Sequence, residues 1–213
     1  MTELGTVRRK VTLELEGWTL FWARLTRIEG AEVDPAAVVA VAESARRRFT
    51  DNKALAADPT VGALRRLFKA AGCDPSRYRP SSEALLRRLV RGDDFPSIHP
   101  LVDLNNALSA ELAVPCCVMR PGTFGTELRL RAGRDDESYE SLRGPFKLAR
   151  KPLLADENGP IDTPITGNVK VKVEADTREA WLVAYLPSAT VSLDEAGAAL
   201  RRLAPGFAVA VEL

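Results

Sequence analysis

The sequence has little of what metal and nucleophile enzymes use. It holds one histidine, His99, and three cysteines in 213 residues. A zinc site or a catalytic triad would have to be built around that single histidine, and no C-x-x-C, H-E-x-x-H, P-loop or G-x-G-x-x-G motif occurs. These absences exclude the usual metalloenzymes and nucleotide hydrolases, so we expect no metal site and no cofactor. His99 precedes Pro100, where a loop histidine that hydrogen-bonds to the backbone is the simplest interpretation.

A strong charge of either sign is also missing. Lys and Arg number 30 against 29 Asp and Glu, which leaves a net charge of +1. No global field therefore exists to hold a polyanion, and any contact with a nucleic acid must be local. The odd number of cysteines, with Cys116 and Cys117 adjacent, is no disulfide framework and indicates a reducing compartment. No signal-like apolar core opens the sequence and no run approaches the roughly 18 residues of a membrane span, so we expect a cytoplasmic protein without a membrane partner.

Helices and strands alternate along the chain in a hairpin-like order. Asp34-Pro35 and Asp58-Pro59 each combine a capping aspartate with a proline at the first helical position, and they predict helices reaching about Phe49 and Gly72. A capping box, Ser192 with Glu195, predicts another. Strands are predicted at 11–15, 18–25, 114–119, 126–133, 169–174, 180–186 and 207–213, and loops at 133–140 and 157–168.

This order favours an α+β fold: one mixed, largely antiparallel sheet with flanking helices, rather than a doubly wound parallel sheet. The hydrophobic content of 46% is enough to bury a substantial core. Since no repeat or long low-complexity linker divides the chain, we expect residues 1–213 to form a single domain.

The stretch 77–115 carries the densest local pattern. Ser81 or Ser82 is expected to cap a helix that ends at Gly92, with an apolar face and an opposite face of arginines, Arg87, Arg88 and Arg91. These arginines are our candidates for a local contact with a polyanion.

A second helix is expected from Pro100 through Leu112, with Asn105 and Asn106 inside it. Each asparagine costs up to about 0.7 kcal/mol relative to alanine in a helix, so the pair is expected to have a tertiary role. That role is either buried hydrogen bonding or contact with a ligand.

Two blocks of sequence carry a family resemblance. The first contains RYRPSSEALLRRLV, then PSIHPLVDLNN and VP, and the second is ADENGPIDTPITGNVKVKVEADTREAWLVAYLP. Together they span roughly 77–187 and resemble the B3/B4 domain of the phenylalanyl-tRNA synthetase beta subunit, the module that hydrolyses tyrosine mischarged onto the phenylalanine tRNA. The resemblance implies a free-standing B3/B4-like domain that binds tRNA or aminoacyl-tRNA, together with an amino-acid-like small molecule.

The resemblance also implies where a pocket lies. Asn106 matches a family asparagine on a helix that borders it, while Asn105 departs from the family's Thr or Tyr. Cys117, after Pro115, falls where bacterial members have a pocket histidine, and Val183 falls near a family glutamate. The segment 159–167 falls on the loop that receives the amino acid, where polar groups stand in place of a glycine pair. The implied substrate-binding residues are Asn105, Pro115, Cys117, Asp162, Thr163 and Gly167.

Three functional hypotheses follow. In the first, the chain hydrolyses a mischarged aminoacyl-tRNA in trans, with Asn106 and Thr166 positioning the attacking water. In the second, the pocket holds an amino acid or small metabolite without catalysis, since the family histidine and glutamate are replaced. In the third, the fold serves as an RNA or protein adaptor. Cys117 is expected to be an ordinary strand cysteine, because no nearby base would hold it as a thiolate.

Overall fold

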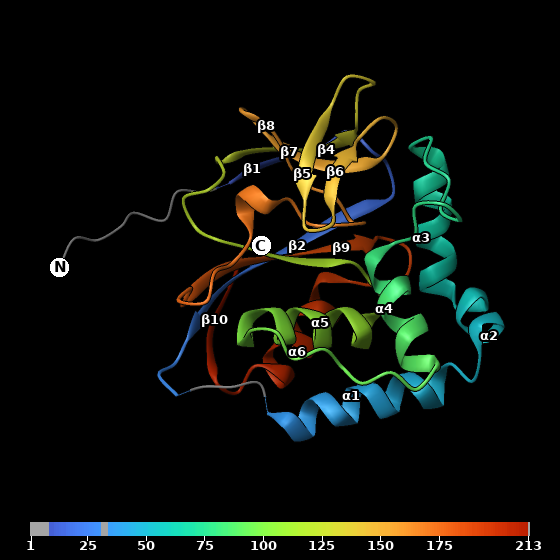
Figure 1. Cartoon of the computed structure of the whole chain (residues 1–213), viewed down its shortest axis with the longest axis vertical. Coiled ribbons are helices and arrows are strands. Elements are labelled where there is room, and N and C mark those ends of the chain that lie inside the picture. Colours follow the sequence, from blue (N-terminus) through green and yellow to red (C-terminus); the bar gives the residue numbers. More distant parts are fainter. Residues whose placement is uncertain (1–8, 31–33, 213) are drawn as a thin grey trace.

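Two four-stranded sheets pack against each other, and most helices cover the outer face of one of them (Figure 1). The computed structural model describes residues 9–30 and 34–212. The helices within these residues are α1 Pro35–Arg48, α2 Asn52–Ala57, α3 Pro59–Ala70, α4 Ser81–Val90, α5 Pro100–Leu112 and α6 Leu193–Leu203, with a short 3-10 helix, η1, at Val169–Val171.

One sheet is mixed and the other is antiparallel throughout. Sheet A has the order β1 Lys10–Leu13, β4 Glu127–Ala132, β7 Pro152–Asp156, β8 Gly159–Asp162, with β1 and β4 parallel. Sheet B has the order β10 Phe207–Glu212, β2 Trp18–Arg27, β9 Glu179–Pro187, β3 Cys116–Met119. A separate hairpin joins β5 Ser138–Ser141 to β6 Gly144–Lys147. The expected α+β class is confirmed, with two packed sheets instead of one.

Sheet B is the wall between two hydrophobic cores. Because side chains alternate along a strand, β9 sends Leu182 and Ala184 into the core beneath α1, α4, α5 and α6, and it sends Val183 and Tyr185 into the core shared with sheet A and α3. The same alternation divides the adjacent cysteines of β3: Cys116 packs against the helical core and Cys117 against the core between the sheets.

The predicted helix starts are confirmed except at α4. The Asp34 and Asp58 side chains accept the N–H groups of Ala36, and of Thr60 and Val61, and Ser192 and Glu195 form the capping box. The expected serine cap of α4 is wrong: Pro80 holds the N-cap position without a side-chain hydrogen bond, and Ser81 and Ser82 are the first two helical residues. Ser82 is buried in the first turn of the helix, and its hydroxyl has no hydrogen-bond partner among the described residues.

Other local predictions also need correction. The alternating run 169–174 is no strand, because the Asn168 side chain accepts the Lys170 N–H and starts η1. The polar run 133–140 contributes to β5, the loop 157–168 contains β8, and α2 was not predicted. The first strand is shorter than expected, and Leu13 is exposed. In each case tertiary pairing, or its absence, overrides the local pattern.

Candidate functional site

Asp162 is the centre of a buried polar cluster between the two sheets. It is the last residue of β8 and is 0% exposed. A turn at Glu157-Asn158 joins β7 to β8, and Gly159, the first residue of β8, has a φ of 125°, a conformation that favours glycine. The Tyr185 hydroxyl, from β9 of the other sheet, donates a hydrogen bond of 2.6 Å to Asp162 Oδ2.

The surroundings of Asp162 raise the pKa of its carboxyl group to a value near neutral pH. Burial raises the pKa of Asp162 to about 7, although the hydrogen bond from Tyr185, the contact with the Cys117 thiol and the Thr163 backbone lower it in part. Burial and the nearby Asp162 carboxyl in turn raise the pKa of Tyr185 well above its usual range, so Tyr185 remains a donor. Asp162 Oδ1 is buried and has no hydrogen-bond partner in the described part of the chain.

A tightly bonded loop, residues 163–167, lies beside this free oxygen. Thr163 Oγ1 accepts the N–H of Thr166 at 3.1 Å, and it donates to the Thr166 carbonyl at 3.0 Å. Tyr139 donates to the same carbonyl at 2.6 Å. Gly167 bridges to Asp162, and a Cβ at Gly167 would lie 3.9 Å from Asp162 Oδ1. Thr166 and Gly167 are half-buried, so the loop connects the carboxyl group to the surface.

The start of β3 closes the other side of the cluster. The carbonyl of Pro115 accepts the N–H of Tyr185 at 2.9 Å, which fixes the register, and Cys117 stands opposite Val183. Burial raises the pKa of the Cys117 thiol well above its usual range, and the negative charge of Asp162 raises it further. Cys117 is therefore a neutral thiol at physiological pH and has no thiolate for nucleophilic attack.

The asparagine pair lies elsewhere. Asn105 and Asn106 sit on α5, which packs on the helical face of sheet B (Figure 1). Tyr185, and Asp162 bonded to it, lie on the face toward sheet A. Asn105 donates to Asn106 Oδ1 at 3.4 Å, and its own Oδ1 is buried with no partner among the described residues. The structure thus groups Pro115, Cys117, Asp162, Thr163, Thr166 and Gly167 and separates the two asparagines from them.

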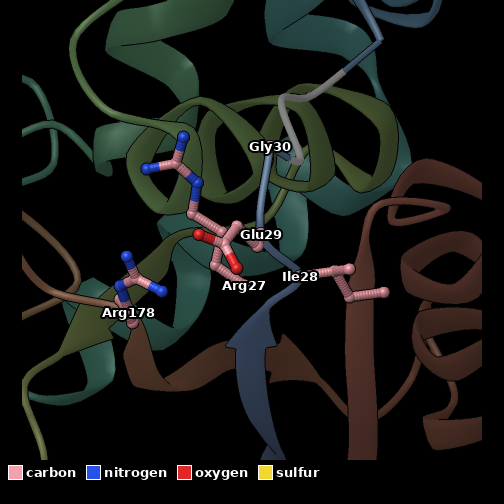
Figure 2. A pocket seen from close by; sticks show the side chains of 5 residues that line it. All are labelled: Arg27, Ile28, Glu29, Gly30 and Arg178. Carbon is pink, nitrogen blue, oxygen red and sulfur yellow. The ribbon is translucent and has the colours of Figure 1, made fainter.

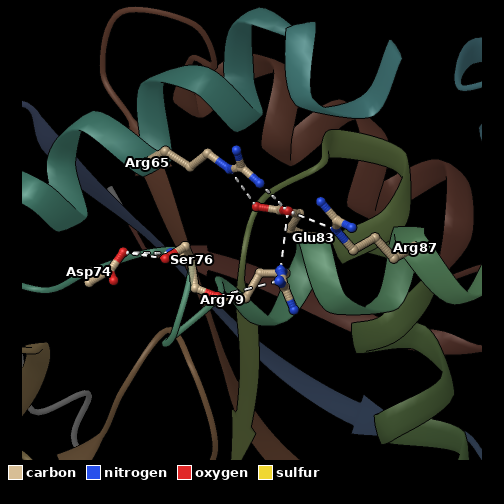
Figure 3. A network of polar contacts seen from close by, with 6 residues as sticks. All are labelled: Arg65, Asp74, Ser76, Arg79, Glu83 and Arg87. Carbon is tan, nitrogen blue, oxygen red and sulfur yellow. Dashed lines mark hydrogen bonds and ion pairs between the residues drawn. The ribbon is translucent and has the colours of Figure 1, made fainter. Parts of the chain in front are cut away.

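The arginines of α4 are held by two different acids. Arg87 donates to the carboxylate of Glu83, which is 1% exposed and also binds Arg65 and Arg79 (Figure 3). Arg88 and Arg91 instead pair with Asp93 on the surface.

Two further features do not belong to this cluster. His99 caps α5, with Nδ1 accepting the Leu101 N–H at 3.2 Å, as expected of a loop histidine. A hollow of about 100 Å³, lined by Arg27, Ile28, Glu29, Gly30 and Arg178, opens at the far end of β2 and β9 (Figure 2). Tyr185 is seven strand positions from Arg178, roughly 20 Å along the strand direction, and none of the expected site residues lines this hollow.

Comparison with known proteins now identifies the family. A model described as the B3/4 domain matches residues 63–201, from α3 to α6. The chain belongs to the B3/4 domain family. A solved N-terminal fragment of the phenylalanyl-tRNA synthetase beta-subunit from Pyrococcus horikoshii is similar at 11% identity and a TM-score of 0.43, over 95% of this chain and 51% of that one. This chain thus spans about half the length of that fragment, and no curated protein matches.

The matched part of this B3/4 domain contains the whole Asp162 cluster and the acid of the arginine cluster. Tyr185, Tyr139 and Glu83 are the polar residues that the sequence did not single out. Each lies within a pattern of another kind: Tyr185 in an apolar strand, Tyr139 in a polar run and Glu83 in a helix first turn. Among the described residues there is no group of three or more His, Cys, Asp and Glu that could hold a metal. None of the described helices combines the length and apolarity needed to cross a bilayer.

Proposed function

We propose that this B3/4 domain hydrolyses the ester bond of a mischarged aminoacyl-tRNA, with Asp162 as the general base. The observation that carries the proposal is a buried carboxyl with a pKa of about 7 and a free Oδ1, next to a loop of small and hydroxylated residues. A group that titrates near neutrality accepts and releases protons efficiently at physiological pH.

The proposed reaction is an attack of water on the ester, assisted by Asp162 as the base. The ionised Asp162 takes a proton from a water whose oxygen attacks the carbonyl carbon of the aminoacyl ester. The tetrahedral intermediate collapses, the bond to the terminal ribose oxygen breaks, and that oxygen takes the proton that Asp162 received from the water, which returns Asp162 to its ionised form. The products are a free amino acid and uncharged tRNA. Thr166 is half-buried at the surface end of the loop, and in this proposal its hydroxyl orients the ester or the water.

Ester hydrolysis by this route needs no thiol, metal or cofactor from the chain. Neutral Cys117 and Pro115 then serve as the wall of the amino-acid site, and Thr163 acts indirectly by holding the loop through its bonds to Thr166. Asn105 and Asn106, on the opposite face of sheet B, support the fold beneath this wall. Arg88 and Arg91, paired only with an exposed acid, remain candidates for contact with the tRNA body.

A panel of mischarged tRNAs tests the proposal. Wild-type protein is expected to deacylate at least one of them, and Asp162→Asn is expected to lower that rate by about a hundredfold or more, the usual contribution of a general base. Deacylation at an unchanged rate by Asp162→Asn would reject the assignment of the base.

A second function is supported by the two positions, Cys117 and Val183, that fall where the family has a histidine and a glutamate. Cys117 and Val183 face each other in the register of β3 and β9, and neither offers an acid or base at neutral pH. A buried carboxylate with a tyrosine partner also suits the ammonium group of a free amino acid. If the wild type cleaves no mischarged tRNA but binds an amino acid by calorimetry, and Asp162→Asn abolishes the binding, the domain is an amino-acid-binding module.

A further inference from the structure

We propose that Arg65, Arg79 and Arg87 form a clamp for a phosphodiester of single-stranded RNA, next to the candidate site. This inference rests on the proposed function in one respect, the identity of the polyanion. The charge, geometry and position of the three arginines support the clamp independently of that function.

The cluster has more positive charge than its acid needs. Three guanidinium groups surround one carboxylate, which leaves two positive charges in excess. Glu83 is fully buried, but the side chains of Arg65, Arg79 and Arg87 keep 30%, 38% and 27% of their surface in solvent. The excess charge is therefore located at the surface and the compensating charge beneath it.

Neutralising Glu83 does not explain the whole cluster. Arg65 alone binds both carboxylate oxygens, with Nε 2.8 Å from Oε2 and Nη2 2.6 Å from Oε1. A bidentate pair of this kind already balances the charge of the carboxylate. Arg79 and Arg87 add mutual repulsion to it, which a second anion would relieve.

The arginines retain donors for such an anion. Arg87 uses its Nε on Glu83, and its Nη groups form no hydrogen bond with described residues. Arg79 is steadied by a weak bond from Nη2 to the Ser76 carbonyl, in a turn closed by Asp74 (Figure 3). Only the Nε of Arg87 is fixed by a hydrogen bond to Glu83, whereas Arg79 Nε lies 3.4 Å from the carboxylate in an ion pair. The N–H groups that remain on these planar guanidinium groups suit the bidentate geometry of phosphate oxygens.

The clamp adjoins the loop of the candidate site. The N–H of Ser81, the first residue of α4, donates to the carbonyl of Pro164 at 2.9 Å, and Glu83 lies two residues further along the helix. The positive end of the α4 dipole adds to the field at this place. An RNA strand that brings its 3′ end to Asp162 and Thr166 would therefore pass its last phosphates over the three arginines.

Binding of a short, uncharged, single-stranded RNA ending in CCA tests the clamp by fluorescence anisotropy. Arg79→Gln and Arg87→Gln are each expected to weaken binding by roughly tenfold at low salt, the usual effect of one charge-assisted contact. Each should also reduce the slope of log affinity against log salt by about 0.7. Arg47→Gln is the matched control, since it removes an equally charged but exposed α1 residue, and it should change affinity by less than about twofold.

Thermal unfolding of the same variants shows whether they fold. Arg79 is the safest variant, because its 3.4 Å ion pair is the longest of the three and Glu83 keeps Arg65 and Arg87. Wild-type affinity in both folded variants, or an equal loss in Arg47→Gln, would overturn the clamp.

The outcomes separate the clamp from the proposed function. Because the RNA carries no ester, its binding does not depend on hydrolysis. If wild type deacylates tRNA while Arg79→Gln and Arg87→Gln bind RNA normally, only the clamp is rejected. If both variants lose RNA affinity as expected while wild type cleaves no ester, the clamp is supported and only the proposed function fails.

Discussion

Tyr185 and Asp162 are joined by a 2.6 Å hydrogen bond that crosses from one sheet to the other. The donor lies on β9 in sheet B, and the acceptor is the last residue of β8 in sheet A. This bond favours the ionised form of Asp162, while burial opposes it. Contacts with the Cys117 thiol and the Thr163 backbone also favour the ionised form, and the balance of all these contacts against burial decides at which pH the carboxyl can act as a base.

Removal of this bond should move the pH dependence of catalysis. With Tyr185→Phe, the pKa of Asp162 rises further, so the increase in deacylation rate with pH should move from about pH 7 to a value higher by about one unit. The measurement is kcat/KM from pH 5 to 9. Tyr139→Phe is the control, since Tyr139 bonds to the Thr166 carbonyl and not to the carboxyl. An unchanged midpoint in Tyr185→Phe would show that Asp162 is not the titrating base.

The free energy of unfolding should also depend on the ionisation of Asp162. The folded-state pKa of Asp162, about 7, lies above the unfolded value of about 3.9, so ionisation destabilises the fold as pH rises between these values. Asp162→Asn removes this penalty and still accepts the Tyr185 hydroxyl. Its free energy of unfolding relative to wild type should therefore increase from pH 4 to pH 8, by at most about 4 kcal/mol. Urea denaturation at both pH values checks this, and a difference that is independent of pH contradicts it.

Substitutions around the loop should separate catalytic from supporting residues. Thr166→Val is expected to lower the deacylation rate by roughly tenfold to a hundredfold, because the hydroxyl at the surface end of the loop is lost. Asn106→Ala, on the other face of sheet B, should alter stability more than rate. Cys117→Ser should retain most activity, because its thiol is neutral. If Cys117→Ser is inactive and Thr166→Val active, a thiol mechanism replaces the one proposed.

The histidine cap gives a prediction about stability at acidic pH. Burial, with the charge of Arg27 nearby, lowers the pKa of His99, and its neutral Nδ1 accepts the Leu101 N–H. His99→Ala should cost about 1 kcal/mol at pH 8, and His99→Asn much less, since asparagine caps helices well. Because the folded pKa lies below the unfolded one, the contribution of His99 fades as pH falls below about 6.5. Wild type should therefore lose stability relative to His99→Asn at pH 5 in thermal unfolding.

The buried acid of the arginine cluster should matter far more than an exposed one. Burial alone would raise the pKa of Glu83, but the hydrogen bonds from Arg65 and Arg87 outweigh it and lower the pKa. Glu83→Gln leaves three cations without their partner and should destabilise the protein by about 3 kcal/mol. Glu43→Gln, in an exposed pair with Arg47, should cost less than about 0.5 kcal/mol. Equal effects in urea denaturation would contradict the structural role of Glu83.

The sequence was sufficient wherever structure is encoded locally. Asp34-Pro35, Asp58-Pro59 and the Ser192 capping box start helices because cap and helix lie within a few residues. The pattern failed at 169–174, where alternation suggested a strand but Asn168 initiates a 3-10 turn. Pairing partners are not visible in a local pattern, and the hairpin strands β5 and β8 were missed for the same reason.

The site was only partly predictable. The resemblance led to Asp162, Thr163, Thr166 and Cys117, which the fold brings together, but it gave no sign that Asn106 lies across sheet B from them. Tyr185 has no polar neighbour in sequence, and its partner is 23 residues away in another sheet. Glu83 looked like a favourable charge at a helix start, whereas its burial depends on α3, a separate helix that supplies Arg65.

The alternation of β9 has a consequence for how this protein can change. Neighbouring positions of β9 pack in separate cores. One core receives Trp181, Val183 and Tyr185, and the other receives Leu182, Ala184 and Leu186. Substitutions at the odd-numbered positions can retune the polar cluster while the even-numbered ones keep the helices in place. A single strand thus lets evolution, or an engineer, vary specificity without redesigning the scaffold, provided that no residue is inserted or deleted within it.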